Sequence, residues 1–305
     1  MMKRPGKNPV STRIWLSGLT IGLMTLLALF APIISPYDPT QMQTGISNHP
    51  PAWYKTPGKS GLPEHLLGTD LLGRDIFSHV IHGARAAMFL VLIAIPLALV
   101  IGVIVAVTAG LGSSFVETIF LRLTDVVSSV PSIMFTVILV FILRRTPVGQ
   151  IFGGLITLAL SFALVNWVGL ARLLYSSVIR IKQLEFMEAS RSLGAGTFYQ
   201  IFKHLPRHLA HLVIVWVVNS VPAVILLEAL LGYIGIQILQ VADGSSFQDL
   251  SWGGLILLGR TQINRNPFIL LPPTLCILFI SMSFSILGEY LNERINPQLE
   301  SSQIL

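Results

Sequence analysis

Six long apolar stretches, each free of Asp, Glu, Lys and Arg, limit what this sequence can fold into. They cover residues 14–35, 86–115, 126–143, 146–171, 209–227 and 266–288. The hydrocarbon core of a bilayer is ~30 Å thick, so a helix that crosses it needs ~20 apolar residues. We therefore predict an all-α membrane protein with six transmembrane helices. The third helix is expected to start earlier than its apolar stretch, near Val116.

The composition excludes several other classes of protein. Charged residues make up 11% of the chain and hydrophobic residues 53%, whereas soluble domains carry ~25% charged residues. The low charged fraction excludes a soluble domain. The high hydrophobic fraction excludes a disordered chain, because such a chain needs low hydrophobicity. A disulfide scaffold is excluded because Cys276 is the only cysteine in the sequence. The net charge of +6 comes from scattered residues, so it does not indicate a nucleic-acid partner.

The distribution of basic residues predicts how the chain is oriented. Cytosolic segments of membrane proteins are enriched in Lys and Arg. The N-terminal tail carries four such residues and segment 172–208 carries six; they are Lys3, Arg4, Lys7, Arg13, Arg172, Arg180, Lys182, Arg191, Lys203 and Arg207. We expect both segments and the C-terminus in the cytosol, and segments 36–85 and 232–265 outside.

Residues 185–206 predict a helix–turn–helix in the cytosol. Gly194 and Gly196 should break the first helix, because glycine reaches backbone angles that other residues avoid. Thr197 and Gln200 have the T-x-x-Q spacing of a capping box at the start of a second helix. Pro206 is expected to end that helix.

The second helix would place Phe198, Ile201, Phe202 and Leu205 on one face. So short an element cannot fold alone, and the apolar face needs a surface on which to bury itself. Periodicity leaves two surfaces open, the inner leaflet of the membrane and a partner protein.

The order of residues in this segment resembles the EAA loop of ABC-importer permeases. Glu188-Ala189 is followed by Gly194 and then by Pro206, while Ser190 replaces the second alanine. In that family the loop is a coupling helix that fits a groove on the ATPase subunit. The resemblance implies that Glu188, Ala189 and Gly194 are the signature residues and that Phe198 to Leu205 form the docking face.

Other segments resemble the peptide-type permeases of that family. Residues 67–75 read Leu-Gly-Thr-Asp-Leu-Leu-Gly-Arg-Asp, which resembles the LGTDxLGRD signature of the C-type subunit. Segments 31–39, 227–229 and 251–253 are similar to further parts of these proteins. The resemblance implies a MetI-like type I importer fold with two parts. Residues 1–85 would form a cytosolic tail, the first helix and an external loop, and residues 86–305 the permease core with coupling loop 172–208.

The resemblance also implies a function and partners. The chain would be the pore-forming permease subunit of an ATP-driven importer in a bacterial cytoplasmic membrane, carrying di- or oligopeptides; nickel or another small solute is the alternative. Its partners would be a homologous B-type permease, two ATPases, an external substrate-binding protein and membrane lipid. ATP and Mg would bind the ATPases, so this chain is expected to bind no cofactor and to be no enzyme.

Two classes of protein outside this family were weighed against it. An ion-coupled secondary carrier should place carboxylates at mid-membrane, whereas the acids here lie toward the ends of the apolar stretches. A membrane scaffold or receptor would not need a cytosolic docking element.

Several polar residues near the apolar stretches are candidates for further sites. Asp70, Arg74 and Asp75 would form either an external rim that receives substrate or the binding protein, or a solvated cap. Arg122 and Asp125, three residues apart, are expected to pair with each other. Polar groups inside the apolar stretches would either line a cavity or hydrogen-bond between helices; they are Asn166, Asn219 and Ser220. Glu228, at the outer end of the fifth stretch, would either line the cavity or snorkel to the membrane interface. The spacings of four and three among His204, His208 and His211 resemble those of a metal cluster. No Cys or carboxylate completes the set, so a basic interfacial face is favoured over a metal site.

Overall fold

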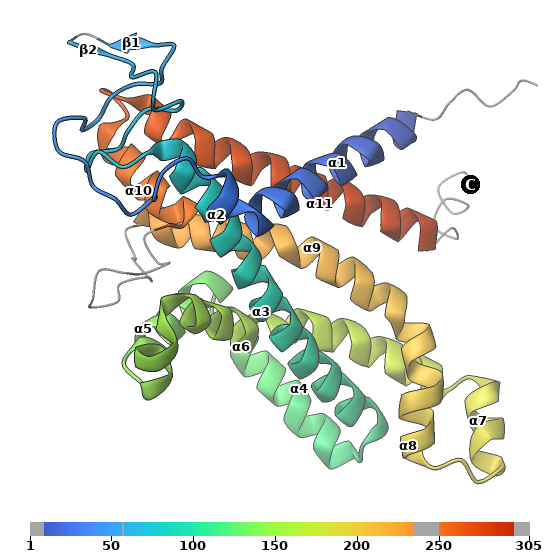
Figure 1. Ribbon diagram of the computed structural model, residues 1–305. Helices are drawn as coiled ribbons and strands as arrows, with labels where there is room; N and C mark the ends of the chain where they lie inside the picture. The colour runs from blue at the N-terminus through green and yellow to red at the C-terminus, as the bar shows by residue number, and fades with distance from the viewer. Residues whose placement is uncertain (1–8, 57, 235–249, 296–305) are drawn as a thin grey trace, which may run out of the picture.

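The computed structural model describes residues 9–56, 58–234 and 250–295. The expected basic tail at residues 1–8 and the last ten residues lie outside this range. Within it the chain is mostly helical, with one two-stranded antiparallel hairpin of β1 (Lys55–Thr56) and β2 (Lys59–Ser60). The predicted all-α membrane fold is confirmed (Figure 1).

The helices range from single turns to spans of 36 residues. In order they are α1 (Pro9–Leu29), α2 (Ala31–Ile34), α3 (Ile76–Leu111), α4 (Ser114–Ser128), α5 (Ser132–Arg144), α6 (Pro147–Lys182), α7 (Glu185–Ser192), α8 (Thr197–Tyr199), the π-helix η1 (Gln200–His204), α9 (Leu205–Ile234), α10 (Trp252–Gln262), the 3₁₀ helix η2 (Pro267–Ile269) and α11 (Leu271–Ile295).

Five helical spans in the described part of the chain are long and apolar enough to cross a membrane. They correspond to α1, α3, α6, the continuous run from α8 to α9, and the run from η2 into α11. The pair α4 and α5 makes a sixth span when it is counted as one, but it is bent by 91°. The predicted third helix is therefore broken in its middle.

The break between α4 and α5 has a cause in the sequence. Pro131 has no backbone N–H, and its ring disfavours a helical conformation at Val130. The backbone of Pro131 is accordingly non-helical, with φ −52° and ψ 126°, and α5 begins at the next residue. The bend places residues 128–132 opposite α6 and α9.

Close packing of α3 against α6 forms the centre of the molecule. Two glycines of α3 allow the approach, because a Cβ on Gly102 would lie 2.9 Å from the Leu170 side chain and one on Gly110 would lie 2.5 Å from Val178. Around this pair, one large core joins residues of α1, α3, α6, α9, α10 and α11.

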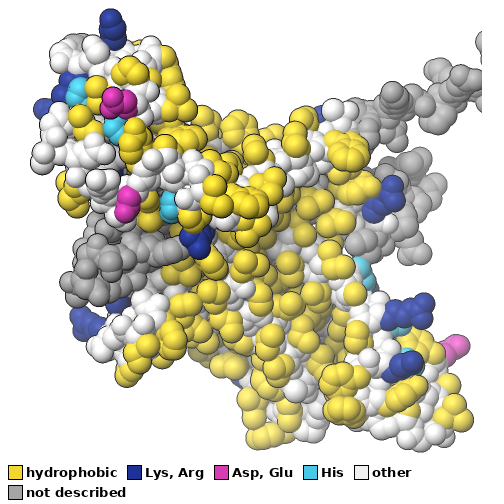
Figure 2. Space-filling model, viewed as in Figure 1, with side chains coloured by type: hydrophobic (Ala, Val, Ile, Leu, Met, Phe, Trp, Pro, Cys, Tyr) yellow, Lys and Arg dark blue, Asp and Glu magenta, His cyan; other side chains and the backbone are white. Residues whose placement is uncertain are grey.

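The outer surface is as apolar as a membrane protein requires. On α1 the side chains of Trp15 and Leu19 are 80% and 70% exposed, and large apolar residues are also exposed on α3, α4, α5 and α11. Figure 2 shows hydrophobic side chains over the middle of one face, with charged ones toward its two ends. This distribution fits helices surrounded by lipid hydrocarbon.

Two polar elements lie at opposite ends of the molecule. The hairpin β1–β2 belongs to a long loop of residues 36–75, called here the 36–75 loop, whereas α7 and α8 lie at the far end (Figure 1). Helix α3 starts at Ile76, directly after this loop. It runs without interruption through residues 85 and 86, where the sequence suggested that one part of the chain ends and another begins.

Candidate functional site

The bend between α4 and α5 forms one wall of a cavity. The cavity has a volume of about 570 Å³, and its other walls come from α6 and α9. A second cavity of about 240 Å³ shares Ser132, Phe162, Asn166 and Ala223 with it and continues along α5 and α9. Together they form a path between the helices, with the 128–132 bend on one side.

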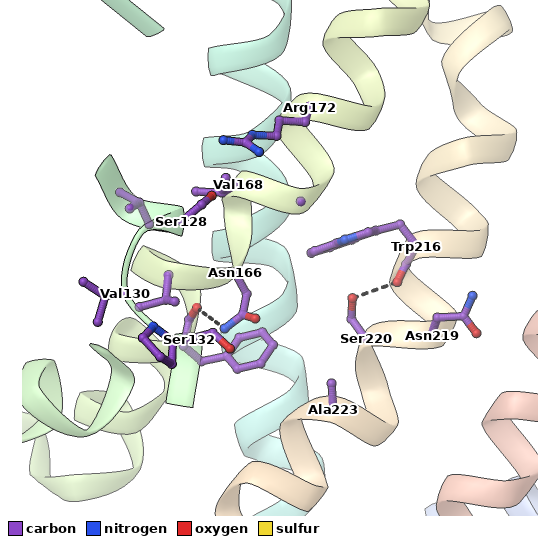
Figure 3. A pocket seen from close by; sticks show the side chains of 15 residues that line it. Ser128, Val130, Ser132, Asn166, Val168, Arg172, Trp216, Asn219, Ser220 and Ala223 are labelled. Carbon is purple, nitrogen blue, oxygen red and sulfur yellow. Dashed lines mark hydrogen bonds between the residues drawn. The ribbon is translucent and has the colours of Figure 1, made fainter. Parts of the chain in front are cut away.

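Asn166 and Trp216 approach each other across the larger cavity from α6 and α9 (Figure 3). The amide nitrogen of Asn166 donates to the Phe162 carbonyl at 3.0 Å, which leaves the amide oxygen for the cavity. Ser220 is also in the wall, but its hydroxyl donates to the Trp216 carbonyl. The cavity therefore combines an indole ring with a few neutral polar groups and the guanidinium of Arg172.

Asn219 is a lining residue whose side chain points away from the cavity, as Figure 3 shows. A Cβ on Gly288 of α11 would lie 2.3 Å from the Asn219 amide oxygen, so the amide faces a close helix–helix contact. Of the two uses weighed for this residue, its position fits helix packing better than a role in the path.

Glu228 does not line either cavity. Its side chain is buried, and the backbone N–H of Gly253 donates to both carboxyl oxygens at 3.2 and 3.3 Å. Gly253 is the second residue of α10, so Glu228 supplies an acceptor for an N–H that the helix leaves unsatisfied. Glu228 therefore connects α9 to α10.

The pairing predicted between Arg122 and Asp125 was wrong. Asp125 of α4 instead accepts a hydrogen bond at 2.8 Å from Arg172, a residue of α6 that lines the large cavity. Nearby, the Tyr175 hydroxyl donates to Glu117. The acids of α4 thus contact α6 across the helix–helix interface, because α4 lies along α6 rather than alone in lipid.

The three acidic and basic residues predicted at an external rim are buried inside the 36–75 loop and the start of α3. Asp70, Arg74 and Asp75 are 0%, 5% and 3% exposed. Arg74 Nε donates to Asp70 Oδ2 at 2.7 Å, within the loop that precedes α3. Asp70 also accepts from the backbone N–H groups of Leu72 and Arg74. These side chains shape the loop and do not face solvent.

Asp75 is the N-cap of α3. One carboxylate oxygen accepts from the backbone N–H and the hydroxyl of Ser78, both at 2.7 Å, and the other contacts His65 Nδ1 at 2.9 Å. Because Ser, Thr, Asp and Asn at this position satisfy free helix N–H groups, the signature residue fixes where the loop ends and the membrane helix begins.

At the opposite end, α7 and α8 form the predicted helix–turn–helix. Gly194 has a φ of +86°, and the Ala195 N–H donates to the Ser190 carbonyl at 3.0 Å. This left-handed glycine with a hydrogen bond across it is the Schellman ending of a helix. Glycine is therefore favoured at position 194 of the motif because the turn requires a left-handed backbone conformation there.

Two details of the predicted second helix were wrong. Its N-cap is Gly196 without a side-chain cap, and Thr197 is already helical, so no T-x-x-Q capping box forms. Pro206 does not end the helix, because the chain continues from α8 through η1 into α9. The wider π turn before Pro206, with Leu205 N–H bonded to the Gln200 carbonyl, accommodates the proline ring and its missing N–H.

The predicted docking face divides into an outer and an inner half. Phe198 and Phe202 are 74% and 66% exposed and lie 4.5 Å apart between ring centroids. Ile201 is half-buried and Leu205 is 2% exposed in the core. Glu188, Ala189 and Gly194 are all exposed. We define the outer docking surface as Glu188, Ala189, Leu193, Phe198 and Phe202.

His204 and His208 pack against an aromatic ring rather than around a metal position. Phe186 of α7 lies 5.5 Å from the ring of His204 and 5.3 Å from that of His208. Among the described residues, no group of three or more His, Cys, Asp or Glu side chains could hold a metal ion.

Sequence reasoning did not single out Met187, Trp216 or the 128–132 bend. The bend had a signal, because Ser-Ser-Val-Pro interrupts an otherwise apolar stretch. Met187 and Trp216 had none, since an apolar residue in an apolar or amphipathic helix looks the same wherever its side chain points.

The chain was compared with known protein families. Residues 98–297 match the family described as the inner membrane component of binding-protein-dependent transport systems. Residues 13–51 match the N-terminal transmembrane domain of oligopeptide transport permease C.

Individual relatives are similar over nearly the whole chain. The oligopeptide transport system permease protein OppC of Bacillus subtilis is 30% identical, over 95% of this chain and 87% of its own length. The di/tripeptide transport system permease protein DppC of Pseudomonas aeruginosa is 31% identical, over 92% of this chain and 86% of its own. The dipeptide permease protein DppC of Haemophilus influenzae is 29% identical, over 93% and 91%.

Proposed function

Because the chain belongs to the family of inner membrane components of binding-protein-dependent transport systems, we propose that it is one permease subunit of an ATP-driven importer of peptides. It would form half of a pore in a bacterial cytoplasmic membrane, together with a homologous B-type permease. Two ATPases would bind at the α7–α8 end and an external binding protein at the end with the 36–75 loop. Both chain termini would then be cytosolic.

The observation that carries this proposal is the outer docking surface at the end of long membrane helices. Two phenylalanine rings in contact, Phe198 and Phe202, are largely exposed there, and the acidic residue Glu188 of α7 is exposed as well. The surface is built on a turn that only a left-handed glycine completes. A hydrophobic patch surrounded by polar groups is typical of a protein–protein interaction site.

The cavity supports a peptide as cargo. Its walls combine the Trp216 ring with the Asn166 amide and the hydroxyls of Ser128 and Ser132. Such neutral groups can exchange hydrogen bonds with peptide backbone without selecting one side chain, and the charge of Arg172, which also lines the cavity, is paired with Asp125. The named relatives are oligopeptide, di/tripeptide and dipeptide permeases, which favours the same class of cargo here.

In the proposed mechanism this chain converts movement of the ATPases into movement of its helices. ATP and Mg would bind to the ATPases, and their closure would displace α7 and α8. The long helices would then move the walls of the cavity, which would open alternately to each side of the membrane. Such a switch requires that nucleotide stabilise one of two states more than the other.

Copurification of the ATPase subunits with this chain tests the proposal. Glu188→Arg reverses a charge on the outer docking surface, and Gly194→Pro forbids the φ of +86° that the turn needs. We expect either change to abolish copurification and transport. Retention of both ATPases by both variants would contradict the assignment of this surface.

Matched controls are available at the opposite end of the molecule. Glu64→Arg makes the same charge reversal at an exposed position, and Gly45→Pro changes another glycine with positive φ, +94°, in the 36–75 loop. Both variants should keep the ATPases bound.

A further inference from the structure

We propose that Met187 is the positioning residue that connects the coupling element to the membrane helices, so that α7 moves with them. The inference deepens the proposed function and rests on it. It concerns not where the ATPases bind but how a displacement of α7 reaches the cavity.

The covalent connections of α7 are too weak to do this alone. A two-residue turn, Gln183–Leu184, joins it to α6, and residues 193–196 join it to α8. The second connection contains Gly194 and Gly196, and a Cβ on either would meet nothing within 4 Å. An eight-residue helix between such joints could rotate without moving its neighbours unless side chains hold it.

Met187 supplies the inner attachment. It is 0% exposed, although residues 184–186 and 188–189 on either side of it are all exposed. Its side chain belongs to a core cluster to which three long helices contribute: Ala106 and Val107 of α3, Leu170, Leu174, Val178 and Ile181 of α6, and Leu205 and Leu209 of α9. One side chain of α7 is thus packed where three membrane helices meet.

A second attachment lies on the outer side of α7. Phe186 stacks on His208 at 5.3 Å with ring planes 20° apart and contacts His204 at 5.5 Å. The Ser190 hydroxyl and His204 Nε2 are 3.4 Å apart. These contacts hold α7 to η1 and α9, whereas Met187 packs into the cluster that also contains side chains of α3 and α6.

Two of the helices that pack around Met187, α6 and α9, also form walls of the cavity, so a movement of Met187 can reach it. Both α6 and α9 continue from the Met187 cluster to the cavity, where they supply Asn166 and Trp216. Because packed interiors resist deformation, a displacement of Met187 is passed to these helices. If the side chain is shortened, α7 can follow the ATPase while the helices stay in place.

The experiment uses the complete importer in proteoliposomes and a readout that needs no identified cargo. Ser132→Cys, in a Cys276→Ser background, places a thiol in the cavity wall, and a membrane-impermeant maleimide reports its accessibility. In this parent we expect ATP with vanadate to change the labelling rate at least about fivefold. The second readout is ATPase copurification.

Met187→Ala should keep the ATPases bound, because the outer docking surface is untouched, and should lose most of the ATP-dependent change in labelling. Met187→Leu, which restores volume without a polar group, should recover it. Leu255→Ala truncates a fully buried side chain of a separate cluster, on α10. It should lower the unfolding temperature as Met187→Ala does but keep the labelling change, which separates loss of coupling from loss of stability.

The inference is overturned if Met187→Ala binds ATPase and switches like the parent. If that variant does not assemble, the smaller truncation Met187→Val decides instead; a reduced labelling change supports the inference and an unchanged one overturns it. A parent protein that binds no ATPase contradicts the proposed function itself.

Discussion

Glu228 of α9 accepts the backbone N–H of Gly253 at the start of α10, with both carboxyl oxygens within 3.3 Å of that nitrogen. The contact joins helices that are separated by residues 235–251. Arg260 strengthens the same junction, because its Nη1 donates to the Tyr233 carbonyl at 2.7 Å. Helices α9 and α10 are therefore held together at two places, and α10 in turn reaches α3 through the Trp252 Nε1 bond to the Val80 carbonyl.

Replacement of Glu228 tests how much the junction between α9 and α10 contributes to the stability of the fold. Glu228→Leu leaves the Gly253 N–H buried without an acceptor, which should lower the free energy of unfolding by about 1–3 kcal/mol. Glu228→Gln keeps an acceptor and should lose less. Thermal unfolding of the detergent-solubilised protein measures both, with the exposed Glu64→Gln as control. Equal unfolding temperatures for Glu228→Leu and the wild type would contradict the role.

The close approach of α9 and α10 predicts a second effect. A Cβ on Gly232 would lie 2.4 Å from the carbonyl carbon of Gly253, so Gly232→Ala must push two backbones apart. We expect a loss of about 1–3 kcal/mol of stability. Gly169→Ala is the matched control, because its Cβ would meet nothing within 4 Å, and it should be neutral or slightly stabilising. Thermal unfolding distinguishes them, and an unaffected Gly232→Ala would show that the helices can separate freely.

The capping role of Asp75 can be tested by proteolysis of the 36–75 loop. Asp75→Ala removes the acceptor for Ser78 and the partner of His65, and should cost about 1–3 kcal/mol locally. Faster cleavage within the loop should result. Asp75→Asn retains a cap and should be cleaved more slowly than Asp75→Ala. Asp38→Ala is the control, because Asp38 is exposed and its carboxylate accepts from the neighbouring Thr40. Unchanged cleavage of Asp75→Ala would count against the cap.

The ion pair of Asp125 and Arg172 should contribute little to stability. The two side chains are 63% and 46% exposed, and exposed pairs contribute about 0.2–1 kcal/mol that salt screens further. A double-mutant cycle with Asp125→Asn and Arg172→Gln should give a coupling energy within that range, decreasing as salt is added. A coupling of several kcal/mol, insensitive to salt, would mean that the pair is shielded from water in the assembled protein.

The turn at Gly194 predicts opposite outcomes for two neighbouring glycines. Gly194→Ala forces a Cβ into a left-handed conformation and should cost about 1–2 kcal/mol. Gly196→Ser keeps φ at −70° and adds a favourable N-cap side chain. Hydrogen exchange at the Ala195 amide, which bonds to Ser190, should accelerate only in Gly194→Ala. Equal protection in both variants would exclude the Schellman ending.

Much of the architecture could be predicted because it depends on local properties of the chain. The apolar stretches predicted the spans, since a helix that satisfies its own backbone is the structure that such a stretch adopts in lipid. Gly194 predicted the end of α7 for a similar reason, as its backbone angles are a property of one residue. Pro206 shows the limit of local rules, because a π turn absorbed a proline that should have ended the helix.

The candidate site could be predicted only in part. Asn166 and Asn219 are equivalent by sequence, yet one amide faces the cavity and the other faces Gly288. Asp125 pairs with Arg172, which is 47 residues away in the sequence, and not with Arg122, which is three residues away. Which way a side chain points on a buried helix depends on how the helix is rotated against its neighbours, and spacing along one helix does not contain that information.

From the sequence alone follow the membrane class, the approximate positions of the spans and the helical element at residues 185–205, because hydrophobicity, helix periodicity and glycine conformation act over a few residues. Tertiary structure alone decided that α4 and α5 meet at 91° beside a cavity, that Glu228 holds α10 and that Met187 enters the core of three helices. Each of these depends on contacts between residues far apart in the chain, which form only when close packing brings whole helices together.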